Sequence, residues 1–498
     1  MSLPAVPAAQ QLIDGKLVGS GSGATFPILN PATGREIGRA PDATAADVDA
    51  AIGTARRAFD TTTWSSDHRF RIACLRQLHQ ALLDHGPLLR ALTTAEGGAP
   101  AFLTTGPQYD VPVEGLGWTL DLAAAYAWES DLGEARPMGI ATRRTLRREA
   151  VGVVAAITPW NFPTQITLAK IGPALAAGNT VVLKPAPDTP WVACELGRLA
   201  ATATDLPPGV FNVVTPRDNA VAQRLATDPR VDLISFTGST ATGRRLAAAA
   251  APTLKKTLLE LGGKSAAIVL DDADLEKAVG SAAFAVSIHA GQGCALTTRL
   301  LVPRAHYDQA VAVAAATMSQ ISPGDPADPS TVCGPVISAV QRDRILDHLG
   351  GVVPDGGRFA CGGGVDRSPS GDLAGGYWIQ PTVVAGLDNS SRAAREEIFG
   401  PVLVVLPHDG DDDAVRIAND SDYGLSGAVD SGSLERAKAV AARVRTGTLS
   451  VNGGVWFSPD APFGGYKQSG VGREMGVAGF EEYLHLKLVA EPAGKDHR

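Results

Sequence analysis

The sequence between residues 151 and 239 alternates short, continuous apolar runs with helical stretches, and this alternation constrains the fold more than any other feature. The apolar runs are VGVVAAITPW (151–160), TVVLKP (180–185), VFNVV (210–214) and VDLISFTG (231–238). Residues 163–177 are typical of a helix, and a second helix is expected from Trp191. Strands that are apolar throughout and alternate with helices indicate a parallel sheet with both faces buried. We therefore predict an α/β fold built from βαβ units.

The carboxyl ends of the predicted strands indicate where a ligand binds. In open parallel sheets, ligands lie beyond these ends, where loops lead into the helices. The loops there carry Trp160 and Asn161, Lys184, Thr215 with Pro216, and residues 237–239. We expect a nucleotide at this edge of the sheet.

The second half of the chain repeats this organisation with different elements. Its apolar runs are SAAIVL (265–270), RLLVP (299–303), PVLVVLP (401–407) and GTLSVNG (447–453). Because 498 residues exceed what one hydrophobic core usually serves, we expect a second α/β unit with a boundary near ELGGKS (260–265). The glycine-rich stretch 355–376 is expected to form a surface excursion. Residues 128–150 and 477–498 fit neither core and are expected at an oligomer interface.

Composition and charge exclude several classes of partner and site. The formal net charge of −8 and the lack of a basic run argue against nucleic acid or an anionic membrane. Five cysteines, without a CxxC pair, fit neither a disulfide framework nor a zinc site and indicate a reducing compartment. The first residues lack the features of a signal peptide, and no alanine-rich stretch is long enough to span a membrane. We therefore expect a cytoplasmic protein. We also expect no metal site, because its nine histidines are scattered.

Three residues carry candidate chemistry. Cys294 stands between small residues in GQGCAL, which leaves its sulfur uncrowded and suits a nucleophile. Glu260 lies in a leucine run, where burial raises the pKa of a carboxyl towards the range of a general base. Asn161 lies in TPWNFP, a turn stiffened by two prolines, where a rigid amide can donate to an oxyanion. Each also has a purely structural explanation: an ordinary free cysteine, a satisfied buried carboxylate and a turn-capping asparagine.

Two other patterns carry no such chemistry. LGGKS (261–265) imitates the end of a phosphate-binding loop, but Leu258 stands where that motif needs a glycine. His289 lies five residues before Cys294, but a Cys–His protease pair takes its histidine from elsewhere in the fold.

Seven motifs in order make the sequence similar to the NAD(P)-dependent aldehyde dehydrogenase superfamily. They are TPWNFP, VVLKPA, FTGSTATG, LELGGKS, GQGC, EEIFGPV and PFGGYKQSG, and the resemblance extends from NPATG near residue 30 to the C-terminus. It implies an enzyme of the non-acylating, hydrolytic type that acts as a homodimer or homotetramer on a small-molecule aldehyde. The implied organisation is a Rossmann-type cofactor domain (1–127 and 151–262), an α/β catalytic domain (263–476) and oligomerisation segments (128–150 and 477–498).

The resemblance also implies a role for each catalytic residue. The Cys294 thiolate attacks the aldehyde, and the Asn161 amide and the Cys294 backbone N–H hold the resulting oxyanion. Hydride leaves to the nicotinamide, and Glu260 activates the water that hydrolyses the thioester. The implied cofactor contacts are Ile157, Thr158, Pro159, Trp160, Lys184 (adenosine ribose), Ala186, Pro187, Phe236, Gly238, Ser239 (pyrophosphate), Leu261, Glu397 (nicotinamide ribose) and Phe399.

Two departures from the family pattern concern the choice of cofactor. Pro187 stands in KPAP where NAD-preferring members carry a glutamate, and Pro216 replaces a glycine near the adenine, followed by Arg217. Proline can neither accept hydrogen bonds from the ribose hydroxyls nor repel a 2′-phosphate. We therefore predict that NAD⁺ is the cofactor and that NADP⁺ is also accepted.

The substrate pocket that the resemblance implies is apolar. It comprises Phe162, Ile166, Ala169, Gly293, Ala295, Val455, Trp456, Phe457 and Phe463. Several of these residues are small where relatives carry bulkier ones, which favours a hydrophobic aliphatic, terpenoid or aromatic aldehyde. Two alternative functions are acyl transfer to coenzyme A, which would dispense with Glu260, and a catalytically idle binding role, which would be expected to lose a catalytic residue.

Overall fold

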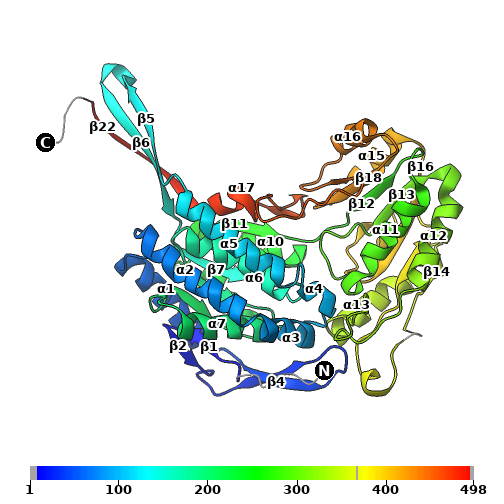
Figure 1. Cartoon of the computed structure of the whole chain (residues 1–498), viewed down its shortest axis with the longest axis horizontal. Coiled ribbons are helices and arrows are strands. Elements are labelled where there is room, and N and C mark those ends of the chain that lie inside the picture. The colour runs from blue at the N-terminus through cyan, green and yellow to red at the C-terminus, as the bar shows by residue number, and fades with distance from the viewer. Residues whose placement is uncertain (1–7, 366–367, 494–498) are drawn as a thin grey trace.

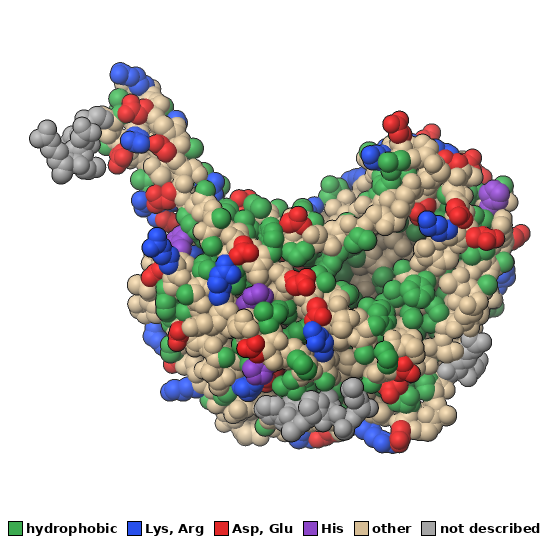
Figure 2. All heavy atoms as spheres, viewed as in Figure 1, with side chains coloured by type: hydrophobic (Ala, Val, Ile, Leu, Met, Phe, Trp, Pro, Cys, Tyr) green, Lys and Arg blue, Asp and Glu red, His purple; other side chains and the backbone are tan. Residues whose placement is uncertain are grey.

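The computed structural model describes residues 8–365 and 368–493. Residues 1–7 of the predicted cofactor domain and residues 494–498 of the predicted oligomerisation segment lie outside the described residues. Figure 1 shows two lobes side by side and a thin arm that projects from the first lobe. The face seen in Figure 2 is hollowed between the two lobes.

The first lobe is built on an eight-stranded sheet. Its strands, in spatial order, are β2 (Lys16–Val18), β1 (Gln11–Ile13), β9 (Phe211–Val213), β8 (Thr180–Lys184), β7 (Val153–Ile157), β10 (Leu233–Thr237), β11 (Lys256–Glu260) and β21 (Gly470–Val471). The five strands from β9 to β11 are parallel, and β1, β2 and β21 run antiparallel to their neighbours. The order β9-β8-β7-β10-β11 is doubly wound, with its switch point between β7 and β10. The predicted α/β fold is confirmed.

Helices bury both faces of this sheet because its strands are apolar throughout. On one face Val154 and Ala156 pack with helices that include α6, and on the other Val153 and Ala155 pack with α1 and α10. The helices of this lobe are α1 (Ala45–Thr61), α2 (His68–Asp84), α3 (Gly86–Gly97), α4 (Ala101–Thr104), α5 (Asp110–Ala125), α6 (Pro163–Ala176), α7 (Trp191–Ala203), α8 (Asn219–Ala222), α9 (Arg224–Thr227), α10 (Thr240–Ala250) and α17 (Gly476–Glu481). The helices expected over 163–177 and from Trp191 are α6 and α7.

The second lobe is built on a seven-stranded sheet. Its strands, in spatial order, are β14 (Arg358–Cys361), β15 (Thr382–Ala385), β16 (Val402–His408), β13 (Arg299–Pro303), β12 (Ala266–Val269), β18 (Gly427–Asp430) and β19 (Ser450–Val451). Only β14 is antiparallel to its neighbour. The expectation that residues 355–376 form only a surface excursion was therefore wrong for 358–361, which pair with β15 at the sheet edge.

Helices cover both faces of the second sheet as well. They are α11 (Leu275–Ser287), α12 (Tyr307–Ser319), α13 (Ala339–Gly350), α14 (Arg392–Arg395), α15 (Asp411–Asn419) and α16 (Leu434–Ala441). Two separate apolar clusters fill the space on either side of the sheet, one against α11 and α12 and the other against α13, α15 and α16.

The arm is a three-stranded antiparallel sheet made by two distant segments. In spatial order its strands are β22 (Leu484–Pro492), β6 (Thr142–Ala150) and β5 (Glu129–Ala135) (Figure 1). The remaining strands form two small two-stranded sheets. In one, β3 (Thr25–Leu29) pairs with β4 (Glu36–Pro41), and in the other, β17 (Tyr423–Gly424) pairs with β20 (Tyr466–Lys467). Within the described residues, no helix combines the length and the apolarity that a membrane span requires.

Candidate active site

A cleft lies at the carboxyl ends of β7, β10 and β11, at the switch point of the first sheet, where doubly wound sheets bind ligands. The register of the strands brings Ile157 beside Phe236 and Thr237 beside Glu260, so the loops that follow start at one level. The second lobe contributes the rest of the lining. The lining residues are Pro159, Trp160, Asn161, Thr237, Gly238, Ser239, Leu261, Gly262, Cys294, Gln341, Arg344, Glu397 and Phe399.

Nine of the sixteen residues that were predicted for catalysis and cofactor binding line this cleft. Asn161 and Cys294 line it, together with seven of the predicted cofactor contacts: Pro159, Trp160, Gly238, Ser239, Leu261, Glu397 and Phe399. The other predicted contacts do not line it, and five of them are buried nearby: Ile157, Thr158, Lys184, Ala186 and Phe236. The sequence placed Thr237 at this edge of the sheet without assigning it a role, and it missed Gly262, Gln341 and Arg344. Thr237 and Gly262 adjoin predicted residues, whereas Gln341 and Arg344 lie on α13, which carries none of the recognised motifs.

Asn161 is buried and held by the loop that carries the cysteine. Its Nδ2 donates a hydrogen bond of 2.9 Å to the carbonyl oxygen of Gln292, two residues before Cys294. A carbonyl oxygen only accepts, so this contact fixes which end of the amide is the NH₂ group. One N–H of that group is engaged, and the second is left to interact with a ligand.

Cys294 is half-buried and lies in a tightly packed loop. A Cβ at Gly263 would lie 2.4 Å from the Cys294 carbonyl oxygen, so only glycine allows these two backbones to approach. Burial, with the nearby carboxylates of Glu397 and Glu260, raises the pKa of the Cys294 thiol to about 12. The thiol is therefore protonated in the free protein and needs a changed environment to become a nucleophile.

Glu260 ends β11 and is fully buried behind the cleft lining. Neither carboxyl oxygen has a hydrogen-bond partner within the described residues. Burial, together with the nearby carboxylate of Glu474, raises the pKa of Glu260 well above its ordinary value. An unpartnered, buried carboxyl with a raised pKa is a candidate general base.

A buried ion pair lies next to Glu260. Lys170 Nζ, on α6, donates to Glu474 Oε1 over 2.5 Å and to Ser235 Oγ over 3.2 Å. The pair neutralises Glu474, whereas Glu260 forms no ion pair among the described residues and interacts with Lys170 and Arg473 only electrostatically. Lys170 opposes the raised pKa of Glu260 but does not contact its carboxyl.

The second lobe contributes a carboxylate and an aromatic ring to the cleft. Glu397 Oε1 accepts a hydrogen bond of 2.9 Å from the backbone N–H of Gly263, and burial raises the pKa of Glu397 to about 7. Phe399 adopts a φ of 61°, and its ring meets that of Trp160 edge-on at 5.3 Å. Gln341 donates to the Phe399 carbonyl oxygen and Arg344 to the Glu397 carbonyl oxygen, which fixes this segment against α13.

The N-terminus of α10 faces the cleft through Ser239. The Ser239 side chain caps the helix by accepting from the Thr242 N–H, and the first N–H groups of a helix have no partner within it. The hydroxyl of Thr237 is buried and has no hydrogen-bond partner among the described residues. Together they offer donors to an anionic group such as a pyrophosphate.

Lys184 lies at the end of β8, outside the cleft lining. Its Nζ donates to the Pro185 carbonyl oxygen over 2.9 Å, and burial lowers the pKa of Lys184 to about 8. Pro187 is half-buried and presents no charge. The next residue, Asp188, interacts electrostatically with both Lys184 and Arg217. Sequence reasoning did not consider this carboxylate.

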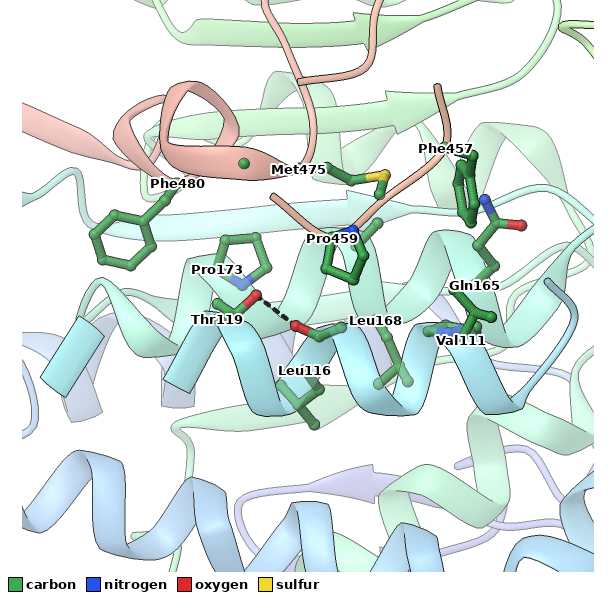
Figure 3. A pocket seen from close by; sticks show the side chains of 14 residues that line it. Val111, Leu116, Thr119, Gln165, Leu168, Pro173, Phe457, Pro459, Met475 and Phe480 are labelled. Atoms are coloured by element: carbon green, nitrogen blue, oxygen red, sulfur yellow. Dashed lines mark hydrogen bonds between the residues drawn. The ribbon is translucent and has the colours of Figure 1, made fainter. Parts of the chain in front are cut away.

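A second cavity lies between α5, α6 and the segment 457–480 (Figure 3). None of its lining residues is charged: Val111, Pro112, Gly115, Leu116, Thr119, Gln165, Leu168, Ala169, Pro173, Phe457, Pro459, Met475, Gly476 and Phe480. Figure 3 shows the Gln165 amide, a polar group of α6, beside Phe457.

Only Ala169 and Phe457 of the predicted substrate pocket line this cavity. Ile166 is buried on α6, and Gly293 and Ala295 flank Cys294. Phe162 packs edge-on against His289 at 5.6 Å, and Trp456 stacks on Phe463 at 5.5 Å. Val455 is 88% exposed. The predicted pocket residues are thus divided among this cavity, the cysteine loop and the surface.

Comparison with known proteins identifies the family. The model of the "Aldehyde dehydrogenase family" matches residues 18–489. The chain belongs to the aldehyde dehydrogenase family. The predicted family, fold and enzyme class are therefore confirmed.

Individual aldehyde dehydrogenases resemble the chain over nearly its whole length. A 3-succinoylsemialdehyde-pyridine dehydrogenase from Pseudomonas sp is 42% identical over 483 residues, which cover 96% of this chain and 97% of the relative. A geranial dehydrogenase from Castellaniella defragrans is 41% identical over 93% of this chain and 94% of its own. The crystal structure of aldehyde dehydrogenase C from Pseudomonas syringae, with NAD⁺ and octanal, is 38% identical, covers 98% of each chain and has a TM-score of 0.91.

The cleft of this aldehyde dehydrogenase fits a dinucleotide. It lies at the switch point of the first sheet, and it presents the unpartnered hydroxyl of Thr237 and the N-terminus of α10. The Glu397 carboxylate lies in the same cleft and can accept hydrogen bonds from ribose hydroxyls. The NAD⁺ bound in the Pseudomonas syringae structure agrees with the predicted cofactor.

Proposed function

We propose that this protein oxidises an apolar aldehyde to its carboxylic acid through a thioester on Cys294, with NAD⁺ as cofactor. The observation that carries the proposal is that Asn161 and Cys294 line one cleft with Ser239 and Glu397, while the unpartnered carboxyl of Glu260 lies behind it. A donor, a nucleophile and a base are thus available around one reaction site.

Cys294 and Asn161 perform the first step. The Cys294 thiol loses its proton to solvent, its sulfur forms a bond to the aldehyde carbon, and the carbonyl π electrons move to the oxygen, which becomes an oxyanion. The second N–H of the Asn161 amide and the backbone N–H of Cys294 donate to this oxygen. Because Gln292 already fixes the amide, little reorganisation is needed when the charge develops.

Residues at the strand ends hold the cofactor. Ser239, Thr237 and the N-terminus of α10 bind the pyrophosphate, and Glu397 binds the nicotinamide ribose, with Trp160 and Phe399 beside it. Lys184 binds the adenosine ribose. Bound NAD⁺ would supply the hydride acceptor, and loss of hydride from the tetrahedral carbon would leave a thioester on Cys294.

Glu260 completes the reaction. As a carboxylate it takes a proton from water, the hydroxide oxygen bonds to the thioester carbon, and the C–S bond breaks to release the acid and the Cys294 thiolate. Its lack of hydrogen-bond partners leaves both oxygens available for this water. The presence of Glu260 argues against acyl transfer to coenzyme A, for which no such base is needed.

Cofactor choice follows from the loop after β8. Pro187 supplies no negative charge against a 2′-phosphate, and Lys184 tolerates either a hydroxyl or a phosphate. We therefore propose that NAD⁺ is used and that NADP⁺ is also accepted.

The uncharged cavity between α5 and α6 supports the proposed substrate class. Without a charged group, it offers no counter-ion to a charged aldehyde, whereas its apolar lining stabilises aliphatic, terpenoid or aromatic ones. Octanal in the Pseudomonas syringae structure and the name of the geranial dehydrogenase are consistent with this class.

The arm supports a homodimer or homotetramer. Met138 and Ile140 at its tip, and Leu486 and Leu488 on β22, are exposed apolar side chains that a second copy of the chain would cover. We propose the cofactor domain (1–127, 151–262), the catalytic domain (263–476), the oligomerisation segments (128–150, 477–498) and a cytoplasmic location. Within the last segment, Phe480 and Tyr483 pack in the core of the first lobe, so the expectation that these residues fit neither core was wrong. The strand β21 lies within the range of the proposed catalytic domain (263–476), but it pairs with β11 of the first sheet.

A turnover assay tests the proposed function. The purified protein is given octanal, benzaldehyde, acetaldehyde or betaine aldehyde with NAD⁺ or NADP⁺, and reduced cofactor is followed at 340 nm. Oxidation of the apolar aldehydes is expected, and Cys294→Ala should abolish it. Failure of the wild-type protein to oxidise any of them would overturn the proposal.

A further inference from the structure

A strained, buried turn lies directly before the cysteine loop. His289, Ala290 and Gly291 follow one another with φ of 52°, 51° and 71°. Two of these residues carry a Cβ, for which this conformation is unfavourable. All three are buried. Such strain persists only where the surrounding structure enforces it, and it occurs often at functional sites.

The imidazole of His289 contacts the backbone of Asn161. Its Nε2 lies 2.9 Å from the Asn161 carbonyl oxygen. Because that oxygen only accepts, Nε2 carries the proton and Nδ1 is an acceptor. Nδ1 is buried and has no partner among the described residues, which costs stability. Among the described residues, the imidazole of His289 therefore makes its hydrogen bond through Nε2 to Asn161 alone.

Asn161 is clamped from both sides. Its carbonyl oxygen also accepts from Gln108 Nε2 over 2.8 Å, so two donors occupy it. Its side-chain Nδ2 donates to the Gln292 carbonyl oxygen. Gln292 is fixed in turn, because its Nε2 donates to the His289 carbonyl oxygen and its Oε1 accepts from the Ile337 N–H. The backbone and the side chain of Asn161 are therefore both tied to the segment that precedes Cys294.

We propose that His289 is a positioning residue that holds the Asn161 amide at the oxyanion. The inference rests on the proposed function, in which Asn161 is the oxyanion donor. Such a donor is effective only where its N–H meets the oxygen at hydrogen-bond distance. Without the imidazole, Gln108 alone donates to the backbone carbonyl oxygen of Asn161. The side-chain amide of Asn161 then moves away from the reacting carbon more freely.

Removal of the imidazole N–H tests this role. His289→Phe keeps a buried ring but loses the donor, and it should lower kcat at least tenfold while the dissociation constant of NAD⁺, measured by calorimetry, changes less than twofold. His289→Gln retains an N–H and should recover most of the rate. His408→Phe is the matched control, because His408 is buried with Nε2 3.0 Å from the Val269 carbonyl oxygen, outside the cleft lining. It should keep kcat within twofold.

A double variant separates positioning from general support of the fold. In an Asn161→Ala background, His289→Phe should cause little further loss of kcat, because the amide that it positions is gone. An equal loss in both backgrounds, or an unchanged kcat in His289→Phe, would overturn the inference. If Asn161→Ala itself leaves kcat unchanged, the oxyanion role fails and the inference fails with it. If His289→Phe does not fold, Gln108→Leu, which removes the other donor to the same oxygen, is tested in both backgrounds with the same criteria.

Discussion

Lys170 Nζ and Glu474 Oε1 form a fully buried ion pair 2.5 Å apart, contributed by residues 304 positions apart in the sequence. The pair lies beside Glu260 and determines which of two neighbouring carboxyls is neutralised by a cation. Glu474 contacts the ammonium and Glu260 does not. Burial and the carboxylate of Glu474 raise the pKa of Glu260. The structure thus separates a structural carboxylate from a candidate base.

Loss of one partner of this pair should destabilise the protein strongly. Lys170→Met leaves the Glu474 carboxylate buried without a cation, and breaking a buried pair typically costs about 3–5 kcal/mol. The double variant Lys170→Met/Glu474→Leu removes both charges and should recover most of that loss. Urea unfolding of the three proteins measures both effects. A double variant as unstable as the single one would show that the charge of Glu474 is not the cause.

The reactivity of Cys294 should depend on pH in a defined direction. Its thiol pKa is raised to about 12, so the thiolate fraction of the free protein is small at neutral pH and grows as pH rises. We expect alkylation of Cys294 by iodoacetamide, followed by peptide mass spectrometry, to accelerate about tenfold per pH unit from pH 7 to 10. A rate that levels off below pH 8 would contradict this, and Cys294→Ala controls for the other cysteines.

The sequence was sufficient for the parts of the fold that local pattern determines. The continuous apolar runs correspond to β7, β8, β9 and β10 within a few residues, because a strand buried on both faces needs an unbroken apolar run. The strand ends then predicted where Asn161 and Ser239 would meet. Its small neighbours made Cys294 a candidate nucleophile, but the choice over an ordinary free cysteine came from the family resemblance, and Glu397 was assigned through that resemblance alone.

Other features depend on partners that a linear pattern does not reveal. The strand β21 has two residues and exists only through its pairing with β11. Gln341 and Arg344 line the cleft because α13 packs beside Glu397. No sequence motif predicts this packing. The ion pair between Lys170 and Glu474 joins α6 to the segment after β21, and the clamp on Asn161 depends on a turn with positive φ at two non-glycine residues.

Cofactor preference should respond to the loop after β8. Pro187→Glu adds a carboxylate that repels a 2′-phosphate, so kcat/KM should shift towards NAD⁺, chiefly because NADP⁺ binds more weakly. Asp188→Asn removes the carboxylate that interacts with Lys184 and Arg217, and it should shift preference towards NADP⁺. Steady-state kinetics with both cofactors measures these shifts. A wild-type preference of about a thousandfold for NAD⁺ would mean that Pro187 does not set the choice.

Aldehyde chain length should increase catalytic efficiency. The cavity between α5 and α6 has no charged lining residue, and each buried methylene contributes about 0.8 kcal/mol. We therefore expect kcat/KM to rise from acetaldehyde to octanal. Ala169→Trp, which fills the cavity, should abolish the gain for octanal and spare acetaldehyde. A preference for acetaldehyde or betaine aldehyde over octanal would contradict the substrate class.

The central claim is a covalent thioester on Cys294 that Glu260 hydrolyses, and trapping that thioester tests the claim most directly. Glu260→Gln is mixed with octanal and NAD⁺, the reduced cofactor is followed by stopped flow, and the quenched protein is mapped by mass spectrometry. The account predicts a burst of about one reduced cofactor per subunit, an octanoyl group on Cys294 and steady-state turnover slowed about 10²–10⁴-fold, the usual cost of losing a general base. An acyl group on another residue, or undiminished turnover by Glu260→Gln, would contradict it.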